Sequence, residues 1–136
     1  MARKQPMLPP SEQPRVRGVP LRAIRKLARE IAERFQPEKI ILFGSYAYGT
    51  PHADSDVDLL VIMPARNMID QAVRIRHATE HRFPLDLIVR SPAYVKRRLK
   101  DGDWFLREIV GHGKVLYEST DEGVGAESGG RLAERE

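Results

Sequence analysis

The apolar residues of this chain follow a helical spacing in some stretches and form short continuous runs in others. The first helical stretch starts at Leu21 and stops before Pro37, with arginines on its polar face. Its apolar positions recur every three or four residues: Leu21, Ile24, Ala28, Ile31 and Phe35. This pattern predicts one long amphipathic helix packed against a core.

Short apolar runs predict four strands, which cover residues 39–43, 57–63, 85–89 and 113–117. Helical patterns between and after them cover residues 45–49, 67–81, 92–99 and 104–110. In the helix at 67–81 we expect Ile69, Ala72 and Val73 to face inward. Strands that alternate with helices in this way predict an α/β (α+β) fold, a small mixed β-sheet with flanking helices.

Composition divides the chain into one folded domain and two polar ends. The chain has 136 residues, enough for a single domain with a modest core. Half of the ten prolines precede Leu21, and the residues after Glu118 are rich in glycine and glutamate. We therefore expect a flexible, basic, proline-rich arm at 1–20, a working domain at 21–118 and a flexible acidic tail at 119–136.

The charge and the residue types exclude some classes of protein. The formal net charge is +4 at pH 7, and the acidic tail offsets a more basic domain. A basic surface attracts nucleotides, nucleic acids or acidic partners, although charged helix faces of an ordinary domain give the same balance. The chain contains no cysteine, which excludes disulfides and thiolate metal sites. It has no apolar run of membrane-spanning length and no apolar core of a signal peptide, so we expect a cytoplasmic protein without a membrane partner.

Candidate chemistry is concentrated in two short motifs that follow the first apolar strand. Gly44 and Ser45 come directly after that strand, where a glycine lets the backbone approach a ligand closely. Asp56 and Asp58 lie two residues apart at the start of the next strand, so their side chains point to the same face, with the two Cα atoms roughly 6.5–7 Å apart. Such carboxylates repel each other unless a cation lies between them. A turn that can hold phosphate beside carboxylates that can hold Mg²⁺ is typical of phosphoryl or nucleotidyl transfer.

A third carboxylate, Asp86, stands in the apolar run at 85–89, where a charged side chain is unexpected unless it faces a cleft or binds a ligand. Taken alone, each feature also has a plain structural interpretation. Asp56 could be an ordinary turn residue, Asp58 could cap a loop, and Ser45 could be the N-cap of a strand-to-helix turn. The occurrence of all of them together favours a site.

These residues resemble the motif of the minimal nucleotidyltransferases (MNT) of the DNA polymerase β superfamily. In that motif a Gly-Ser pair is followed, after about ten residues, by Asp-x-Asp on the next strand. Here Gly44 and Ser45 are followed by Asp56-Val57-Asp58 at this spacing, and the similarity runs from the helix near Leu21 to the segment at 113–117. The resemblance implies a polymerase β-like nucleotidyltransferase fold and transfer of a nucleoside monophosphate, AMP from ATP, to an acceptor hydroxyl.

The resemblance also implies a role for each residue of the motif. Gly44 and Ser45 would bind the β- and γ-phosphates of the nucleotide. Asp56, Asp58 and Asp86 would be the catalytic residues and would bind two Mg²⁺ ions, for which Mn²⁺ can substitute, in a two-metal displacement. Asp86 would in addition accept the proton of the attacking hydroxyl as a general base.

Two groups of aromatic residues need separate interpretation. Tyr46 and Tyr48 stand where relatives often carry arginine, so the grip on phosphate is expected to depend more on the metal ions. Trp104, Phe105 and Tyr117 are expected in the core, although Trp104 could instead stack on a base near the cleft.

Two histidines on the helix predicted at 67–81 form a candidate zinc site. His77 and His81 lie four residues apart, a spacing that can bind zinc. Glu80 lies off the face that the two histidines share, and no third ligand is suggested nearby. Ordinary surface histidines are therefore expected.

The acceptor is the part of the function that the motifs leave open. A minimal domain of this length resembles the antitoxin of HEPN/MNT toxin–antitoxin pairs, in which AMPylation of a tyrosine silences a helical HEPN ribonuclease toxin. A type VII-like antitoxin with ATP and such a toxin as partners is the leading interpretation. A nucleotidyltransferase for a small molecule or an RNA, and a non-catalytic antitoxin that masks its partner by contact, are the alternatives. A plain nucleic-acid binder rests on net charge alone, and the oligomeric state is open.

Overall fold

The computed structural model describes residues 18–52, 54–120 and 131–132. The elements are α1 (Leu21–Phe35), β1 (Lys39–Phe43), α2 (Ser45–Tyr48), β2 (Val57–Ile62), α3 (Met68–Ala78), β3 (Leu85–Arg90), α4 (Pro92–Lys100), α5 (Trp104–His112), β4 (Lys114–Glu118) and β5 (Arg131–Leu132). Every helix and strand expected from the sequence is present, with its ends displaced by at most three residues. The predicted α/β fold is confirmed.

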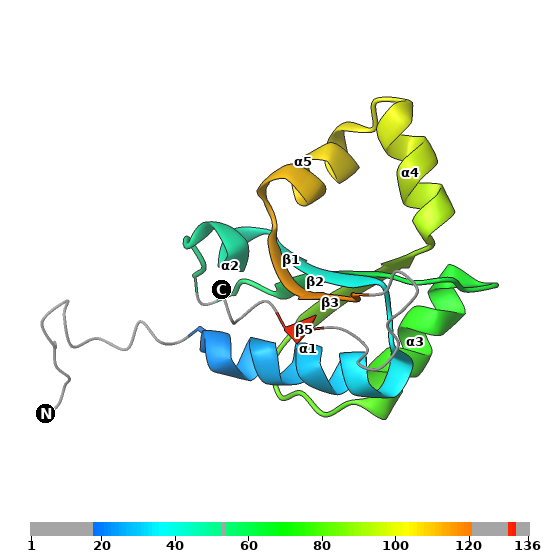
Figure 1. Cartoon of the computed structure of the whole chain (residues 1–136). Helices are drawn as coiled ribbons and strands as arrows, with labels where there is room; N and C mark the ends of the chain where they lie inside the picture. The colour runs from blue at the N-terminus through cyan, green and yellow to red at the C-terminus, as the bar shows by residue number, and fades with distance from the viewer. Residues whose placement is uncertain (1–17, 53, 121–130, 133–136) are drawn as a thin grey trace, which may run out of the picture.

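A mixed five-stranded sheet lies at the centre of the molecule, in the order β3-β2-β1-β4-β5 (Figure 1). β1 pairs antiparallel with both β2 and β4. β2 and β3 run parallel, because α3 carries the chain back between them. Since β1 and β2 are interior strands with both faces covered, their sequences are continuous apolar runs rather than alternating ones.

Two pairs of helices cover the two faces of the sheet. α1 and α3 lie on one face, and α4 and α5 on the other (Figure 1). The inward stripe of α1 is formed by buried residues at helical spacing, namely Ile24, Leu27, Ala28, Ile31 and Ala32. On the opposite face, alternate residues of β1 and β2 pack against α4 and α5, namely Ile41, Phe43, Leu60 and Ile62. The sheet therefore separates two apolar cores.

The predicted inward face of α3 was correct for Ala72, which packs against the core, and wrong for Ile69 and Val73. Ile69 and Val73 are 75% and 44% exposed, whereas Ile75 is completely buried. α3 has only a narrow apolar stripe, and its contact with the core is made by the last turn, where Ile75 follows half-buried Ala72. Because the apolar stripe is so narrow, a small rotation of the helix about its axis changes which residues face the core.

The aromatic residues also differ from expectation. Tyr117 is buried in β4 as predicted, but Trp104 and Phe105 are exposed in the first turn of α5. Leu106 and Ile109 form the inward face of this helix instead. A residue two positions before Leu106 lies about 200° around the helix from it, so Trp104 cannot share the buried face.

Most of the two predicted flexible ends, the arm at 1–20 and the tail at 119–136, lies outside the described residues. Within the tail, Arg131 and Leu132 pair with Glu118 and Tyr117 and form β5 at the sheet edge, which the sequence did not predict. None of the helices in the described ranges has the length and apolar character needed to cross a membrane.

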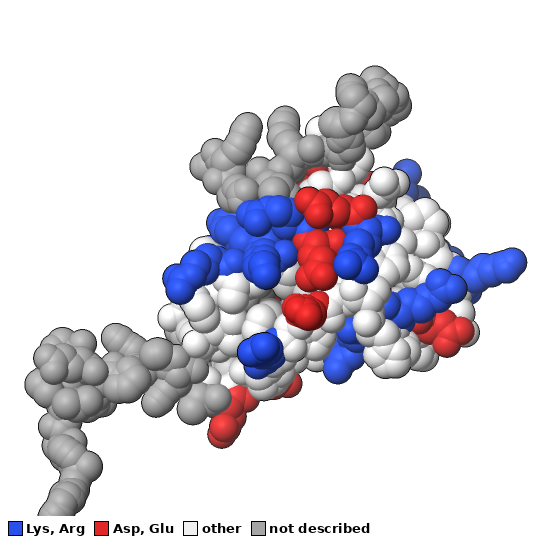
Figure 2. All heavy atoms as spheres, turned by 90° about the horizontal axis from the view of Figure 1, so that it is seen from below, with Lys and Arg blue, Asp and Glu red and all other residues white. Residues whose placement is uncertain are grey.

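Basic residues are prominent on the face covered by α1. Figure 2 views this side and shows Lys and Arg spread over it, with a band of acidic residues between them. On α1 itself, Arg34 lies 3.9 Å from Glu30, so part of the positive charge is compensated within the helix. This face is therefore mixed in charge rather than uniformly basic.

The orientation of α3 can be tested with two matched substitutions on one helix. We expect Ile75→Ala to lower the free energy of unfolding by about 3 kcal/mol, because it leaves a cavity in the core. Ile69→Ala should change it by less than about 0.5 kcal/mol, since the side chain is in solvent. Urea denaturation measures both. Equal losses for the two variants would contradict the observed face of α3.

Candidate active site

Two of the three predicted acids, Asp58 and Asp86, lie side by side at one end of the sheet, where β1 ends and where β2 and β3 begin. Phe43 at the end of β1 lies directly opposite Asp58 in β2. Asp58 in turn lies beside Asp86 in β3 in the parallel register. Side chains alternate along a strand, so all three point to the face covered by α4 and α5, like Leu60 and Ile88 further along. Two carboxylates and an aromatic ring thus form a row across three strands. Asp58, Asp86 and the preceding Asp56 are called the acidic row below.

Gly44 completes this row at the start of the turn that leads into α2. Its φ of 79° and ψ of −162° are accessible to glycine alone. A side chain at this position would also overlap the carboxyl group of Asp58, because a Cβ atom there would lie 3.1 Å from Cγ and closer still to one oxygen. The backbone of the Gly44–Ser45 turn is therefore in direct contact with the acidic cluster.

The carboxylates interact electrostatically. The pKa of Asp58 is raised from an ordinary value of 3.8 to about 6, first by burial and then by the negative charges of Asp86 and Asp56 and a hydrogen bond with Asp86. Asp58 is half-buried, whereas Asp56, which directly precedes β2, and Asp86 on the edge strand β3 are exposed. Asp58 thus lies close enough to both other acids to be repelled by their charges.

These residues fit a divalent metal ion by their chemistry. Carboxylate oxygens are the donors that Mg²⁺ and Mn²⁺ prefer, and the repulsion around Asp58 is of the kind that a cation relieves. In the described part of the chain, however, no three Asp, Glu, His or Cys side chains are already gathered closely enough to hold an ion. The exposed carboxylates of Asp56 and Asp86 can change rotamer at little cost. The three carboxylates are therefore sequence neighbours or strand neighbours that are not gathered into a metal site in the described residues.

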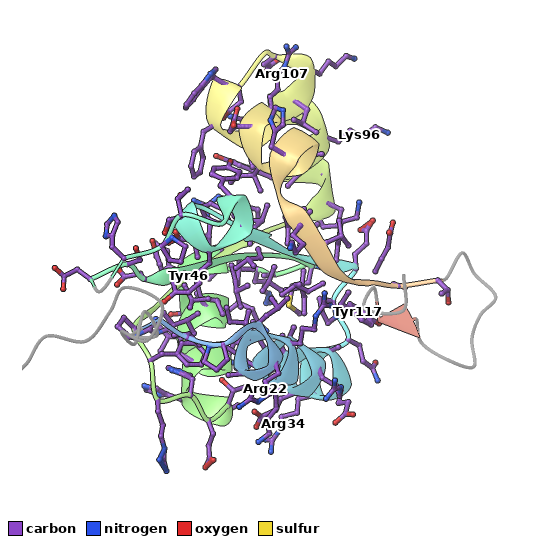
Figure 3. All side chains as sticks on the ribbon, turned by 90° about the vertical axis from the view of Figure 1, so that its left-hand side faces the viewer. Arg22, Arg34, Tyr46, Lys96, Arg107 and Tyr117 are labelled. Atoms are coloured by element: carbon purple, nitrogen blue, oxygen red, sulfur yellow. The ribbon has the colours of Figure 1, made fainter. Side chains whose placement is uncertain are left out.

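The two tyrosines of α2 connect this short helix to both layers of the molecule. The hydroxyl of Tyr46 accepts a hydrogen bond from the backbone N–H of Val19 at 2.9 Å, and Figure 3 shows Tyr46 on the α1 side of the sheet. The hydroxyl of Tyr48 donates to Glu108 Oε2 on α5, at 3.3 Å. Neither tyrosine therefore acts as a substitute for a phosphate-binding arginine in this structure.

α5 forms a wall beside the acidic row. The ring of Phe105 meets that of Phe43 edge to face, with centroids 5.8 Å apart. The side chain of Asp103 caps the start of α5 by accepting from the N–H of Leu106 at 3.0 Å, and it pairs with Arg98 of α4 at 2.9 Å. Sequence reasoning missed these contacts, although an aspartate directly before a helical pattern is a recognisable N-cap signal.

The histidine pair does not form a metal site. α3 ends at Ala78, so His77 lies on the helix while His81 lies beyond it, with its ring tilted against that of Phe83 and the centroids 5.9 Å apart. The i, i+4 geometry that zinc binding needs is therefore absent. The expectation of ordinary histidines agrees with this arrangement.

Comparison with known proteins identifies the family. The sequence profile of the nucleotidyltransferase domain family matches residues 24–116, a span that contains the whole acidic row and the turn at Gly44. The chain belongs to the nucleotidyltransferase domain family. Enzymes of this family generally use divalent metal ions, which agrees with the carboxylate donors found here.

Individual relatives support the same family. The chain is 30% identical over 77 residues, and 28% identical over 101 residues, to two proteins of Methanocaldococcus jannaschii that are both named "putative protein adenylyltransferase". These matches cover 56% and 71% of this chain, and 75% and 96% of the relatives. A crystal structure of a Sulfolobus solfataricus protein described as a "putative nucleotidyltransferase" matches with a TM-score of 0.52 at 20% identity, over 82% of this chain and 86% of the other, and shows the shared fold.

Charge repulsion at Asp58 gives a prediction about the metal-free protein. We expect Asp58→Asn to raise the free energy of unfolding by about 1 kcal/mol at pH 8, after allowance for solvent screening of a half-buried group. The pKa of Asp58 in the folded protein, about 6, exceeds the ordinary value of 3.8. The ionised carboxylate therefore lowers the free energy of unfolding, and this effect is fully present above pH 6. It decreases as the pH falls through 6 and is absent near pH 3.8, where the two proteins should be equally stable. Denaturation in EDTA at several pH values measures this, with exposed Asp54→Asn as the control.

The close contact at Gly44 gives a second prediction. Gly44 and Gly49 both have a φ of 79°, but a Cβ at Gly49 would meet nothing within 4 Å. We expect Gly49→Ala to cost about 1 kcal/mol of stability, from backbone strain alone. Gly44→Ala should cost at least about 2 kcal/mol more, because it displaces the Asp58 carboxyl and because a ψ of −162° at this φ is accessible to glycine alone. Thermal denaturation of the two variants tests this, and equal losses would contradict the described contact.

Proposed function

We propose that this chain transfers AMP from ATP to a hydroxyl group, and that the acceptor is a tyrosine of a HEPN ribonuclease toxin. The observation that carries the proposal is the row in which Gly44 touches the carboxyl of Asp58 and Asp58 lies beside Asp86. A phosphate-binding turn in contact with clustered carboxylates suits a nucleoside triphosphate and its cations. The names of the two adenylyltransferase relatives agree with AMP as the transferred group.

In the proposed reaction the acceptor oxygen attacks the α-phosphorus, a P–O bond forms, and the bond to the β-phosphate breaks to release pyrophosphate. Gly44 and Ser45 hold the β- and γ-phosphates. Asp86 accepts the proton that the acceptor hydroxyl loses. Asp56, Asp58 and Asp86 are the residues that would hold two Mg²⁺ ions, which neutralise the triphosphate and lower the pKa of the acceptor hydroxyl when bound.

A protein acceptor is supported by the openness of the acidic row. Asp56 and Asp86 are exposed, and Asp86 lies on the edge strand β3, where a large substrate has access. Enzymes for small molecules usually enclose most of the substrate in a pocket, whereas an exposed site suits a residue on a protein surface.

A docking surface for the toxin is best supported on α4. Two stretches of the chain are rich in Lys and Arg, residues 22–34 of α1 and residues 96–98 of α4. α1 covers the face of the sheet opposite to the carboxylates, whereas α4 covers the same face. Lys96 and Arg97 are exposed there, and Figure 3 shows Lys96 pointing outward from α4. Opposite charge on the partner would steer it to the side on which transfer takes place.

One observation favours a second candidate function. Because the three acids are not gathered into a metal-binding group in the described residues, a non-catalytic antitoxin that masks its toxin by contact alone also fits the structure. The two candidates differ in whether the partner protein gains mass. A masking protein leaves the partner unmodified, even in a stable complex.

The proposed function is tested with the general base. A helical protein that co-purifies with the chain is first identified. The two proteins are then co-expressed, and the intact mass of the partner is measured. We expect the mass to rise by one or more AMP units with the wild-type chain. Asp86→Asn should abolish the increase while the complex still forms, since the amide keeps the shape of the carboxylate but neither accepts the proton nor binds metal.

Asp101→Asn, which changes an exposed carboxylate in the α4–α5 turn, is the matched control and should leave the modification intact. A stable complex in which the wild-type chain adds no AMP would support masking instead of transfer. Loss of modification in the control as well would show that general charge, rather than Asp86, is responsible.

A further inference from the structure

Two adjacent aromatic side chains at the start of α5 are left in solvent. Trp104 is 71% exposed and Phe105 is 47% exposed, although the same helix buries Leu106 and Ile109. Large aromatic residues contribute most when they are buried, and neighbouring exposed ones are typical of surfaces that bind a ligand. Packing within the described chain does not explain why both stand here.

The contact of Phe105 relates the start of α5, where Trp104 precedes it, to the acidic row. Phe105 packs edge to face on Phe43, with ring centroids 5.8 Å apart. Phe43 lies directly opposite Asp58 and is followed by Gly44, the first residue of the phosphate-binding turn proposed above. One ring therefore separates Phe105 from both the carboxylates and the turn.

The start of α5 is held firmly in this position. Asp103 caps the helix and forms an ion pair with Arg98, with Arg98 Nη2 2.9 Å from Asp103 Oδ2. One turn later, Glu108 accepts a hydrogen bond from Tyr48 of α2, the helix that follows Gly44. The aromatic pair and the turn are thus fixed relative to each other, as a preorganised binding surface requires.

We propose that Trp104 and Phe105 form the base-binding wall of the nucleotide site, on which the base of the nucleoside triphosphate stacks. The inference rests on the proposed function, because it takes the phosphates to lie at Gly44 and the acidic row. Every base has a flat π-face, so stacking on indole and phenyl rings tolerates different bases and favours the larger purines. The wall therefore selects a purine nucleotide and discriminates weakly between adenine and guanine.

The chain contains a single tryptophan, so its fluorescence reports on Trp104 alone. The full chain is titrated with Mg²⁺ complexes of ATP, GTP, CTP and inorganic tripolyphosphate. We expect saturable quenching with ATP and GTP, weaker quenching with CTP, and none with tripolyphosphate. Calorimetry should nevertheless detect binding of tripolyphosphate, because it occupies the phosphate and metal positions without a base.

Substitutions then separate stacking from the rest of the site. Trp104→Leu and Phe105→Leu should each weaken ATP binding about tenfold, equivalent to about 1.4 kcal/mol, and leave tripolyphosphate binding unchanged. Val110→Ala, another exposed apolar position of α5, is the matched control and should bind ATP like the wild type. Circular dichroism confirms that each variant is folded.

Each remaining outcome overturns a distinct statement. ATP binding and AMP transfer without quenching, or with unchanged affinity in Trp104→Leu and Phe105→Leu, overturn the stacking wall and leave the proposed function standing. Loss of the partner complex in these variants with unchanged ATP affinity assigns the aromatic pair to partner contact and also overturns it. Failure of the wild-type chain to bind either ATP or tripolyphosphate overturns the wall and the proposed function together.

Discussion

The pairing of β2 with β3 holds Asp58 and Asp86 side by side, although their negative charges repel each other. β2 and β3 pair so that these two residues are direct neighbours, and the same register buries Leu59, Val61 and Val89 further along. A shift of β3 by one residue would turn its alternating buried set, Leu85, Leu87 and Val89, out of the core. Burying one such side chain stabilises the fold by about 1.5–3 kcal/mol, more than the approximately 1 kcal/mol that repulsion at Asp58 costs. The core therefore holds the acids in place.

α2 depends on its neighbours in the same way. A helix of four residues does not form on its own, because nucleation is unfavourable and few hydrogen bonds reward it. Its tyrosines supply the missing stabilisation, since Tyr46 bonds to the chain before α1 and Tyr48 bonds to α5. The position of the turn at Gly44 is thus determined by contacts with both layers. A structural role for the tyrosines also explains how they replace the arginines of the resembled motif without carrying charge.

Local sequence patterns were enough to predict the helices and strands. They were less reliable for predicting which side chains of a helix face the core. Strands with continuous apolar runs, such as β1 and β2, are visible in sequence because neighbouring residues determine them. The inward faces of α3 and α5 were misjudged, since a short helix with few apolar residues takes its orientation from the sheet beneath it.

The candidate site follows the same division. The spacing of Asp56 and Asp58, and the Gly44–Ser45 turn, are local features that can be read along the chain. That Asp86 lies beside Asp58 depends on β3 pairing parallel with β2, and that Tyr48 meets Glu108 depends on a contact across 60 residues of sequence. Pairings of this kind are set by tertiary packing, so the sequence could suggest the acids but not their arrangement.

The electrostatics of the row bear on the order of events in the proposed function. A nucleoside triphosphate brings several negative charges to a cluster of three acids that already repel one another. The tyrosines of α2 offer no positive charge to offset this, because a phenol is never cationic, and both hydroxyls are hydrogen-bonded elsewhere. Nucleotide binding is therefore unfavourable unless cations enter with it, and cation binding gains from the relief of repulsion at Asp58. The two ligands thus favour each other's binding through charge alone, without any change in the fold.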